Sequence, residues 1–190
     1  MLRCKTRQTN FLHWLSAMQD KMFCLKKFWL SLLIFLNFAD VLRKLLGVFP
    51  NLAMTTDSSC TTALHTAATQ GHIDVVNLLL ETDANLVKIA RNNGKTVLHS
   101  AARMGHLEVV RSLLIKDSST GFRIDKKGQT ALHMAVKGQN EEIVLELLKP
   151  DPSVMHVEDN KGNTALHVAI KKGRAQVLPH FFISHPFLLS

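Results

Sequence analysis

Apolar residues recur in one arrangement four times along the chain, and each copy follows the previous one after 34 residues. Every copy opens with the pattern Thr-x-Leu-His, whose histidines are His65, His99, His133 and His167. Apolar residues then continue at the spacing of an amphipathic helix and resume in aliphatic pairs such as Val75–Val76 and Leu79–Leu80. This periodicity predicts two short helices in each repeat and a core shared between neighbouring repeats.

Polar and glycine positions predict where these helices begin and end. The threonines at the expected N-caps, whose hydroxyls can accept a hydrogen bond from the first turn, are Thr62, Thr96, Thr130 and Thr164. Left-handed glycines are expected to end the first helix at Gly71, Gly105 and Gly173. The third repeat differs, because Gln139 takes this position and Gly138 comes one residue early.

Another glycine precedes the threonine by two residues in three of the repeats and predicts a tight turn there. These glycines are Gly94, Gly128 and Gly162. The first repeat has Cys60 at the equivalent position, which predicts a looser turn.

The patterns Thr-x-Leu-His-x-Ala-Ala, Gly-His and Val-Val-x-x-Leu-Leu resemble the ankyrin repeat over about Ala39 to Gln176. The chain departs from that family in having Ala or Val after the threonine, where Pro is usual, and in a period one residue longer. The resemblance implies an all-α repeat solenoid of ankyrin repeats, with helix pairs and short β-hairpin fingers. It also implies that the threonines and histidines of the pattern are structural repeat anchors, because in the family this histidine bonds to the neighbouring loop backbone.

Three segments further resemble a plant subfamily of ankyrin-repeat membrane proteins, which carry a C-terminal multi-span PGG domain. They are Ala53–Asp57, Thr62–Leu80 and Gly162–His167. This resemblance implies a role in stress or defence signalling at the cytoplasmic face of the plasma membrane. No PGG domain follows in this chain, so it is expected to be a truncated relative.

The repeat period predicts the organisation of the chain. Residues 1–27 form a divergent basic arm, whose order or disorder the sequence leaves open, and residues 28–56 form a partial repeat. Four repeats follow at residues 57–90, 91–124, 125–158 and 159–190, the last one incomplete and ending in an apolar tail.

Both ends of the repeat array carry unusual apolar sequence. Residues 28–39 allow three interpretations: a buried helix that covers the first repeat, a membrane-associated segment, or an unstructured one. They are too short for a spanning helix, which needs about 20 residues. In the fourth repeat, Pro179 falls within the expected second helix and is predicted to interrupt it. The apolar tail that follows predicts self-association, because a terminal repeat needs a polar outer face.

Charge and cysteine content narrow the functional classes. The net charge is +8, but residues 1–50 hold eight basic side chains against Asp20 and Asp40, so the repeats are nearly neutral and specific nucleic-acid binding is disfavoured. Three widely spaced cysteines indicate neither a disulfide framework nor a zinc site. The sequence shows no nucleophile motif, phosphate loop or carboxylate pair, so we expect no enzyme activity, metal or cofactor.

The candidate binding residues occupy the finger tips and the exposed side of each first helix, which bind partners in the ankyrin family. The positions with the strongest chemistry are Asn92, Asn93, Lys95, Arg103, Met104, Lys126, Lys127, Gln129, Lys137, Lys161, Lys171 and Lys172. Eight of these are basic and none is acidic. The pattern is compatible with a merely solvent-exposed wall or with an electropositive groove for an acidic partner.

These observations predict a protein-interaction scaffold or adaptor that binds through its concave surface without covalent chemistry. The partner is expected to be a protein with an acidic surface. The alternative is an adaptor held at a membrane by its apolar N-terminal segment or tail. The expected location is the cytoplasm or the cytoplasmic face of a membrane.

Overall fold

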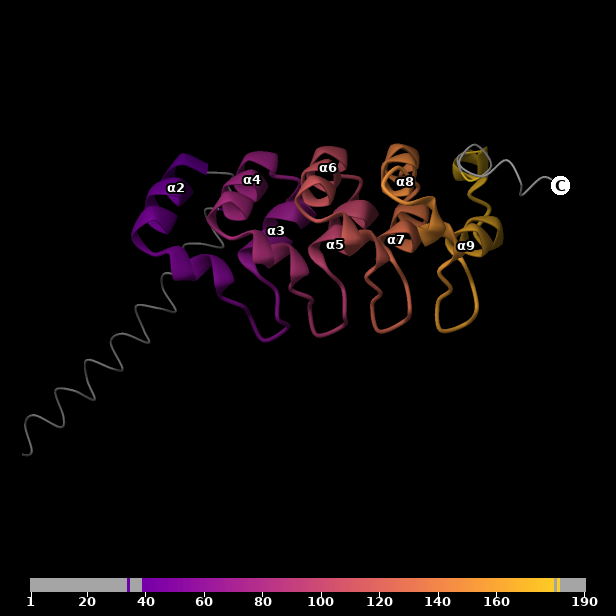
Figure 1. Ribbon diagram of the computed structural model, residues 1–190, viewed down its shortest axis with the longest axis horizontal. Coiled ribbons are helices and arrows are strands. Elements are labelled where there is room, and N and C mark those ends of the chain that lie inside the picture. Colours follow the sequence, from indigo (N-terminus) through magenta and orange to yellow (C-terminus); the bar gives the residue numbers. More distant parts are fainter. Residues whose placement is uncertain (1–33, 35–38, 180, 182–190) are drawn as a thin grey trace, which may run out of the picture.

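The computed structural model describes Ile34, residues 39–179 and Phe181, and its helices form two rows along one long axis (Figure 1). One row contains the first helices of the repeats: α3 (Ala63–Gln70), α5 (Val97–Met104), α7 (Ala131–Gly138) and α9 (Ala165–Lys171). The other row contains α2 (Ala39–Val48), α4 (Ile73–Thr82), α6 (Leu107–Lys116) and α8 (Glu141–Leu148). Each helix pair packs on the next, so the molecule is the all-α repeat solenoid that the periodicity predicts.

Short 3-10 helices return the chain from the second row towards the next repeat. They are η1 (Pro50–Met54), η2 (Ala84–Lys88), η3 (Ser118–Phe122) and η4 (Pro152–His156), while η5 (Ala175–Val177) follows α9. An aspartate begins η2, η3 and η4, and its carboxylate accepts a hydrogen bond from the backbone N–H two residues later. The same local sequence therefore produces the same turn in successive repeats.

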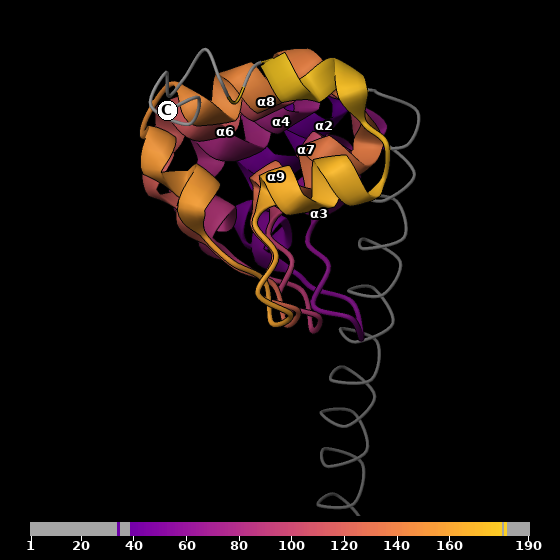
Figure 2. The same ribbon diagram turned by 90° about the vertical axis from the view of Figure 1, so that its right-hand side faces the viewer.

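A continuous apolar core lies between the two rows, which Figure 2 shows nearly end-on as two layers above the fingers. The leucine of each pattern is fully buried in the first three repeats, as Leu64, Leu98 and Leu132. Burying a side chain of this size contributes about 1.5–3 kcal/mol. In the fourth repeat the equivalent Leu166 is only half-buried and Ile170 is 62% exposed, since no described residue packs on that face of α9.

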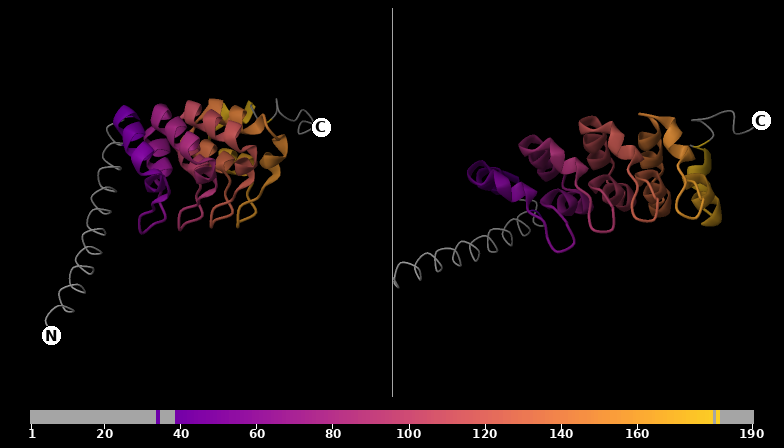
Figure 3. Two further views of the ribbon diagram at one scale, coloured as in Figure 1. Left: turned by 60° about the vertical axis from the view of Figure 1, so that its left-hand side comes forward. Right: turned by 60° about the horizontal axis from the view of Figure 1, so that its bottom comes forward.

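The loops between repeats form fingers that project to one side of the solenoid (Figure 3). Each finger is tied to the next by a backbone hydrogen bond, from Asn92 N–H to the Ser59 carbonyl, from Lys126 to Asn93 and from Asn160 to Lys127, at 2.9–3.0 Å. Isolated β-bridges close the first two fingers, between Thr56 and Thr62 and between Ala90 and Thr96.

The expectation of a looser first finger is wrong. Cys60 adopts the left-handed conformation itself, with φ of 56°, and its N–H donates to the Asp57 carbonyl at 3.0 Å. Gly94 makes the equivalent bond to Arg91 at 2.8 Å. The tie between neighbouring fingers fixes the turn, so the cysteine takes up a conformation that its Cβ disfavours.

The two ends of the array fit the core in different ways. Helix α2 lies within the partial repeat expected at residues 28–56, and Ile34 is helical and 1% exposed; the remainder of residues 1–38 lies outside the described part of the chain. In the fourth repeat, the expected second helix starts as the 3-10 helix η5, and Pro179 and Phe181 are helical. Phe181 is fully buried, so the apolar tail begins inside the core. Residues 182–190 lie outside the description, and no described helix has the length and apolar character needed to cross a membrane.

Candidate functional site

The Thr–His pairs fix the start of every first helix. In each pair the threonine hydroxyl lies 2.8–3.0 Å from the histidine Nδ1, and the threonine backbone N–H donates to the same Nδ1. Because Nδ1 accepts this bond, Nε2 carries the proton and can donate to a carbonyl. His99 donates to the Gln129 carbonyl at 2.8 Å and His133 to the Asn163 carbonyl at 3.1 Å. The pairs of the second and third repeats therefore link their own helices to the next finger.

The imidazoles of the first three repeats are buried, and their burial keeps them neutral. Burial lowers the pKa of His99 and of His133, and it lowers the pKa of His65 to about 4, with a further contribution from the nearby Arg91. Nε2 of His65 points towards Lys95 but has no hydrogen-bond partner of normal geometry among the described residues. His167, by contrast, is exposed.

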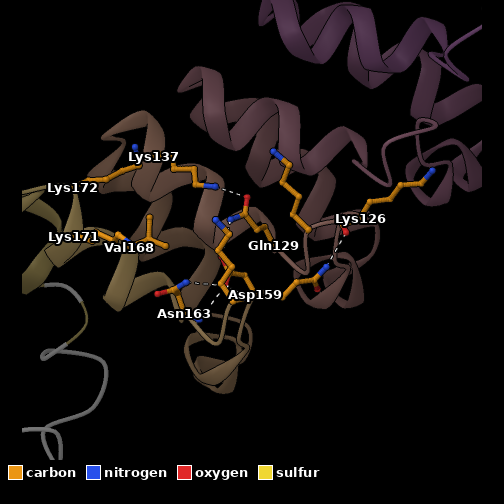
Figure 4. Close-up of a pocket in the computed structure, with 11 residues that line it drawn as sticks. Lys126, Gln129, Lys137, Asp159, Asn163, Val168, Lys171 and Lys172 are labelled. Atoms are coloured by element: carbon orange, nitrogen blue, oxygen red, sulfur yellow. Dashed lines mark hydrogen bonds between the residues drawn. The ribbon is translucent and has the colours of Figure 1, made fainter.

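A cavity of about 700 Å³ opens between the fingers and the first helices of the third and fourth repeats (Figure 4). We call it the lysine groove, because six lysines line it: Lys126, Lys127, Lys137, Lys161, Lys171 and Lys172. The fingers contribute Lys126, Lys127 and Lys161, and the ends of α7 and α9 contribute the others. The remaining lining residues are Gln129, Asp159, Asn160, Asn163 and Val168.

A hydrogen-bonded chain forms the floor of the lysine groove. Lys137 Nζ donates to Gln129 Oε1, and Gln129 Nε2 donates to Asp159 Oδ2 at 3.0 Å. Asp159 Oδ1 accepts from the backbone N–H groups of Lys161 and Asn163, at 2.9 and 3.0 Å, and from the Asn163 side chain at 3.1 Å. Both Asp159 and Gln129 are buried, at 9% and 7% exposed.

The floor has a defined charge state. Burial by itself would raise the pKa of Asp159, but the hydrogen bonds from Asn163, Gln129 and Lys161 outweigh it and hold the pKa well below the usual range. Burial lowers the pKa of the half-buried Lys137. The carboxylate is thus ionised, and its hydrogen bonds come from backbone and amide donors, so it forms no ion pair with a groove lysine.

Ion pairs are segregated from this surface. On the second row, Arg111 lies 2.8 Å from Glu108 and 3.3 Å from Glu146, and Lys149 lies 2.8 Å from Glu146. Across the described ranges, none of the six groove lysines lies within 4.0 Å of a carboxylate oxygen. The groove therefore presents unpaired positive charge.

The structure divides the candidate binding residues into two groups. Seven of them line the lysine groove: its six lysines and Gln129. The other five belong to the second repeat and lie outside the cavity: Asn92, Asn93, Lys95, Arg103 and Met104. Of these, Asn92 donates to the Ser58 carbonyl and Asn93 accepts from Lys95 N–H, so both amides serve the finger.

Sequence reasoning missed Asp159, which completes the floor. The available signal was the recurrence of this aspartate five residues before the N-cap threonine, as Asp57, Asp125 and Asp159. In all three fingers this carboxylate accepts the backbone N–H groups two and four residues later. The second repeat has Arg91 instead, with a buried Nε that no described residue pairs.

No cluster of three or more histidine, cysteine or acidic side chains suited to a metal ion occurs in the described part of the chain. The donors that converge on the lysine groove are ammonium and amide groups, which bind anions.

Stacked helix pairs with hydrogen-bonded fingers and a concave cationic surface define a helical-repeat binding protein. A family model described as ankyrin repeats in three copies matches residues 30–124 and 116–183. The chain belongs to the ankyrin-repeat family, whose members are typically non-enzymatic scaffolds that bind other proteins. A search of curated proteins found no significant match.

Proposed function

We propose that this chain is an interaction scaffold or adaptor that binds the acidic surface of a partner protein in its lysine groove, without covalent chemistry. The observation that carries this proposal is the set of six lysines that line one concavity without an ion pair among the described residues. Five of the six are exposed, so the packing of the solenoid does not require them to be cationic. On the second row, by contrast, Glu108 pairs with Arg111, and Glu146 pairs with Arg111 and Lys149.

The test compares two charge reversals of equal size. Lys126→Glu with Lys171→Glu alters the lysine groove, whereas Lys88→Glu with Lys116→Glu alters exposed lysines of η2 and α6. Proteins that the wild type and the control retain in affinity purification, but the groove variant loses, are the candidate partners. For such a partner, the groove variant should lower the association rate roughly tenfold at low salt, and added salt should narrow the difference. Equal loss with both variants would contradict binding in the groove.

We further propose that this binding serves stress or defence signalling in a plant, in the cytoplasm or at the cytoplasmic face of the plasma membrane. The support is the resemblance of Ala53–Asp57, Thr62–Leu80 and Gly162–His167 to the plant membrane-protein subfamily. The partners lost selectively from the groove variant should then include components of those pathways. A set of partners with no such component would contradict the assignment.

The alternative function is an adaptor held at a membrane. It is favoured by the apolar residues 28–38, which follow the basic pair Lys26–Lys27. Flotation with vesicles of phosphatidylcholine and phosphatidylserine tests it. Recovery of the chain with the vesicles, abolished by Lys26→Glu with Lys27→Glu and unaffected by the groove variant, would favour membrane attachment over partner binding alone.

A further inference from the structure

The lysine groove carries more positive charge than an ordinary acidic segment can neutralise. Its lining holds six lysines and one carboxylate, and that carboxylate accepts four hydrogen bonds from the floor. An excess of five positive charges thus faces one cavity of about 700 Å³. Like charges gathered in this way repel one another, so the free groove is electrostatically destabilised until an anion enters.

One ammonium group is held in place before any ligand binds. Lys137 is half-buried, and its Nζ donates to the Gln129 side chain, which Asp159 fixes in turn. Lys137 spends one of its three N–H donors on this bond, so two remain for a ligand. A donor that is already ordered loses less conformational entropy on binding than a free surface lysine does.

The size of the groove limits how much charge a peptide can bring. Neighbouring first-row helices pack about 8–10 Å apart, and an extended peptide rises about 3.3 Å per residue with alternate side chains on one face. A segment that crosses from the third repeat to the fourth therefore turns about two side chains towards the lysines. Two carboxylates carry about two negative charges, whereas two phosphoserines carry about three to four and offer three acceptor oxygens each.

We propose that the lysine groove recognises a doubly phosphorylated segment of the partner protein, with Lys137 as a fixed donor at its floor and Gln129 as the residue that positions it. This rests on the proposed function and adds the chemistry of the partner. The two phosphates lie on the same side of an extended segment, with one residue between the two phosphoserines. The exposed lysines of the fingers and the lysines at the end of α9 surround them.

The experiment uses the full chain and beads that carry degenerate peptides with a central pSer-x-pSer, Glu-x-Glu or Ser-x-Ser. Degenerate flanks remove the dependence on any one sequence. We expect the phosphorylated beads to retain at least about tenfold more protein than the glutamate beads, because charge and acceptor number both rise. Lys137→Met and, separately, Lys171→Met should each reduce this retention about tenfold, whereas Lys88→Met should not change it.

Each other outcome has a defined meaning. Equal retention on phosphorylated and glutamate beads, lost in the groove variants, would overturn phosphate recognition and leave the acidic-partner function standing. Retention that Lys137→Met does not alter would overturn the role of the fixed donor. If no bead retains the chain while inositol hexakisphosphate raises its melting temperature, the occupant is a free small polyanion and the proposal is wrong. If nothing binds, the phosphate inference fails, and the affinity purification decides the proposed function separately.

Discussion

Individual residues in this chain combine conformational and electrostatic tasks. The histidine of each repeat accepts from its threonine through Nδ1, which fixes the proton on Nε2, and in the second and third repeats Nε2 donates to the next finger. Cys60 and Gln139 adopt the left-handed conformation at positions where other repeats have glycine. The burial of a histidine and the backbone strain at Cys60 each lead to a measurable prediction.

His65 should make stability depend on pH. Its folded pKa of about 4 lies below its ordinary value of 6.5, so the folded state binds the proton less readily and stability is lost as the pH falls from 6.5 towards 4. Between about pH 7 and pH 5, the wild type should lose about 2 kcal/mol more than His65→Gln does, at 1.36 kcal/mol per pKa unit. Denaturant unfolding at several pH values measures this, and parallel curves for the two proteins would show that His65 is not the titrating group.

Cys60→Gly should stabilise the protein. A glycine adopts a left-handed φ without the Cβ clash, as Gly94 and Gly128 do in the equivalent turns, at 80° and 74°. We expect the free energy of unfolding of Cys60→Gly to exceed that of Cys60→Ala by about 1 kcal/mol. Both substitutions remove the thiol, but only alanine keeps the Cβ clash. The comparison is made by denaturant unfolding under reducing conditions. Equal stability of the two variants would mean that this turn is not strained.

At the scale of the helices, each element depends on its neighbour for part of its hydrogen bonding. The cap of α7 is buried and His133 also reaches the Asn163 carbonyl of the following finger, whereas the chemically identical cap of α9 is exposed. Gly138 permits a close approach between α7 and α5, because a Cβ there would overlap the Arg103 carbonyl oxygen. The same Thr–His pattern therefore stabilises the fold more in the middle of the stack than at its end.

A matched pair of double variants tests this difference. Thr130→Ala with His133→Ala should cost about 2–3 kcal/mol, because a cap and a buried hydrogen bond between repeats are lost together. Thr164→Ala with His167→Ala should cost about 1 kcal/mol, since only the cap is lost. Chemical denaturation of both variants measures the two losses. Equal costs would indicate that the contact with the next finger contributes nothing.

At the scale of the whole molecule, the solenoid is asymmetric in both charge and packing. The six groove lysines all belong to the third and fourth repeats, whereas the first repeat has Ser58, Ser59 and Thr69 at equivalent positions. Towards the C-terminal end, Ile170 of α9 is 62% exposed, while the equivalent Val136 of α7 is fully buried. A solenoid face of this kind normally receives another repeat or a polar cap.

We predict that the full chain self-associates through this face of α9. Ile170→Lys should shift the protein towards the monomer in sedimentation velocity, because a charge would be buried in the contact. Ile115→Lys is the control, since Ile115 is 83% exposed on α6 and lies away from that face. A wild type that sediments as a monomer over a range of concentrations would contradict the prediction, and so would an equal effect of both substitutions.

The sequence by itself determined the repeat architecture of this protein. A local pattern repeated in register specifies the same caps, turns and helices each time, so the period and the Thr–His pairs could be read from the order of residues. The sequence also indicated that lysine is frequent at the finger tips and on the exposed side of the first helices, because the repeat period identifies those positions.

Only the tertiary structure decided which of these residues share a site. Lys137, Gln129 and Asp159 come from different elements, and their hydrogen-bonded chain depends on how the fourth finger sits against the third. The same packing separates Lys95 and Arg103 from the lysine groove, places Phe181 in the core and holds Cys60 in a tight turn. These are distances between repeats, set by side-chain packing and burial, and a pattern along one chain does not encode them directly.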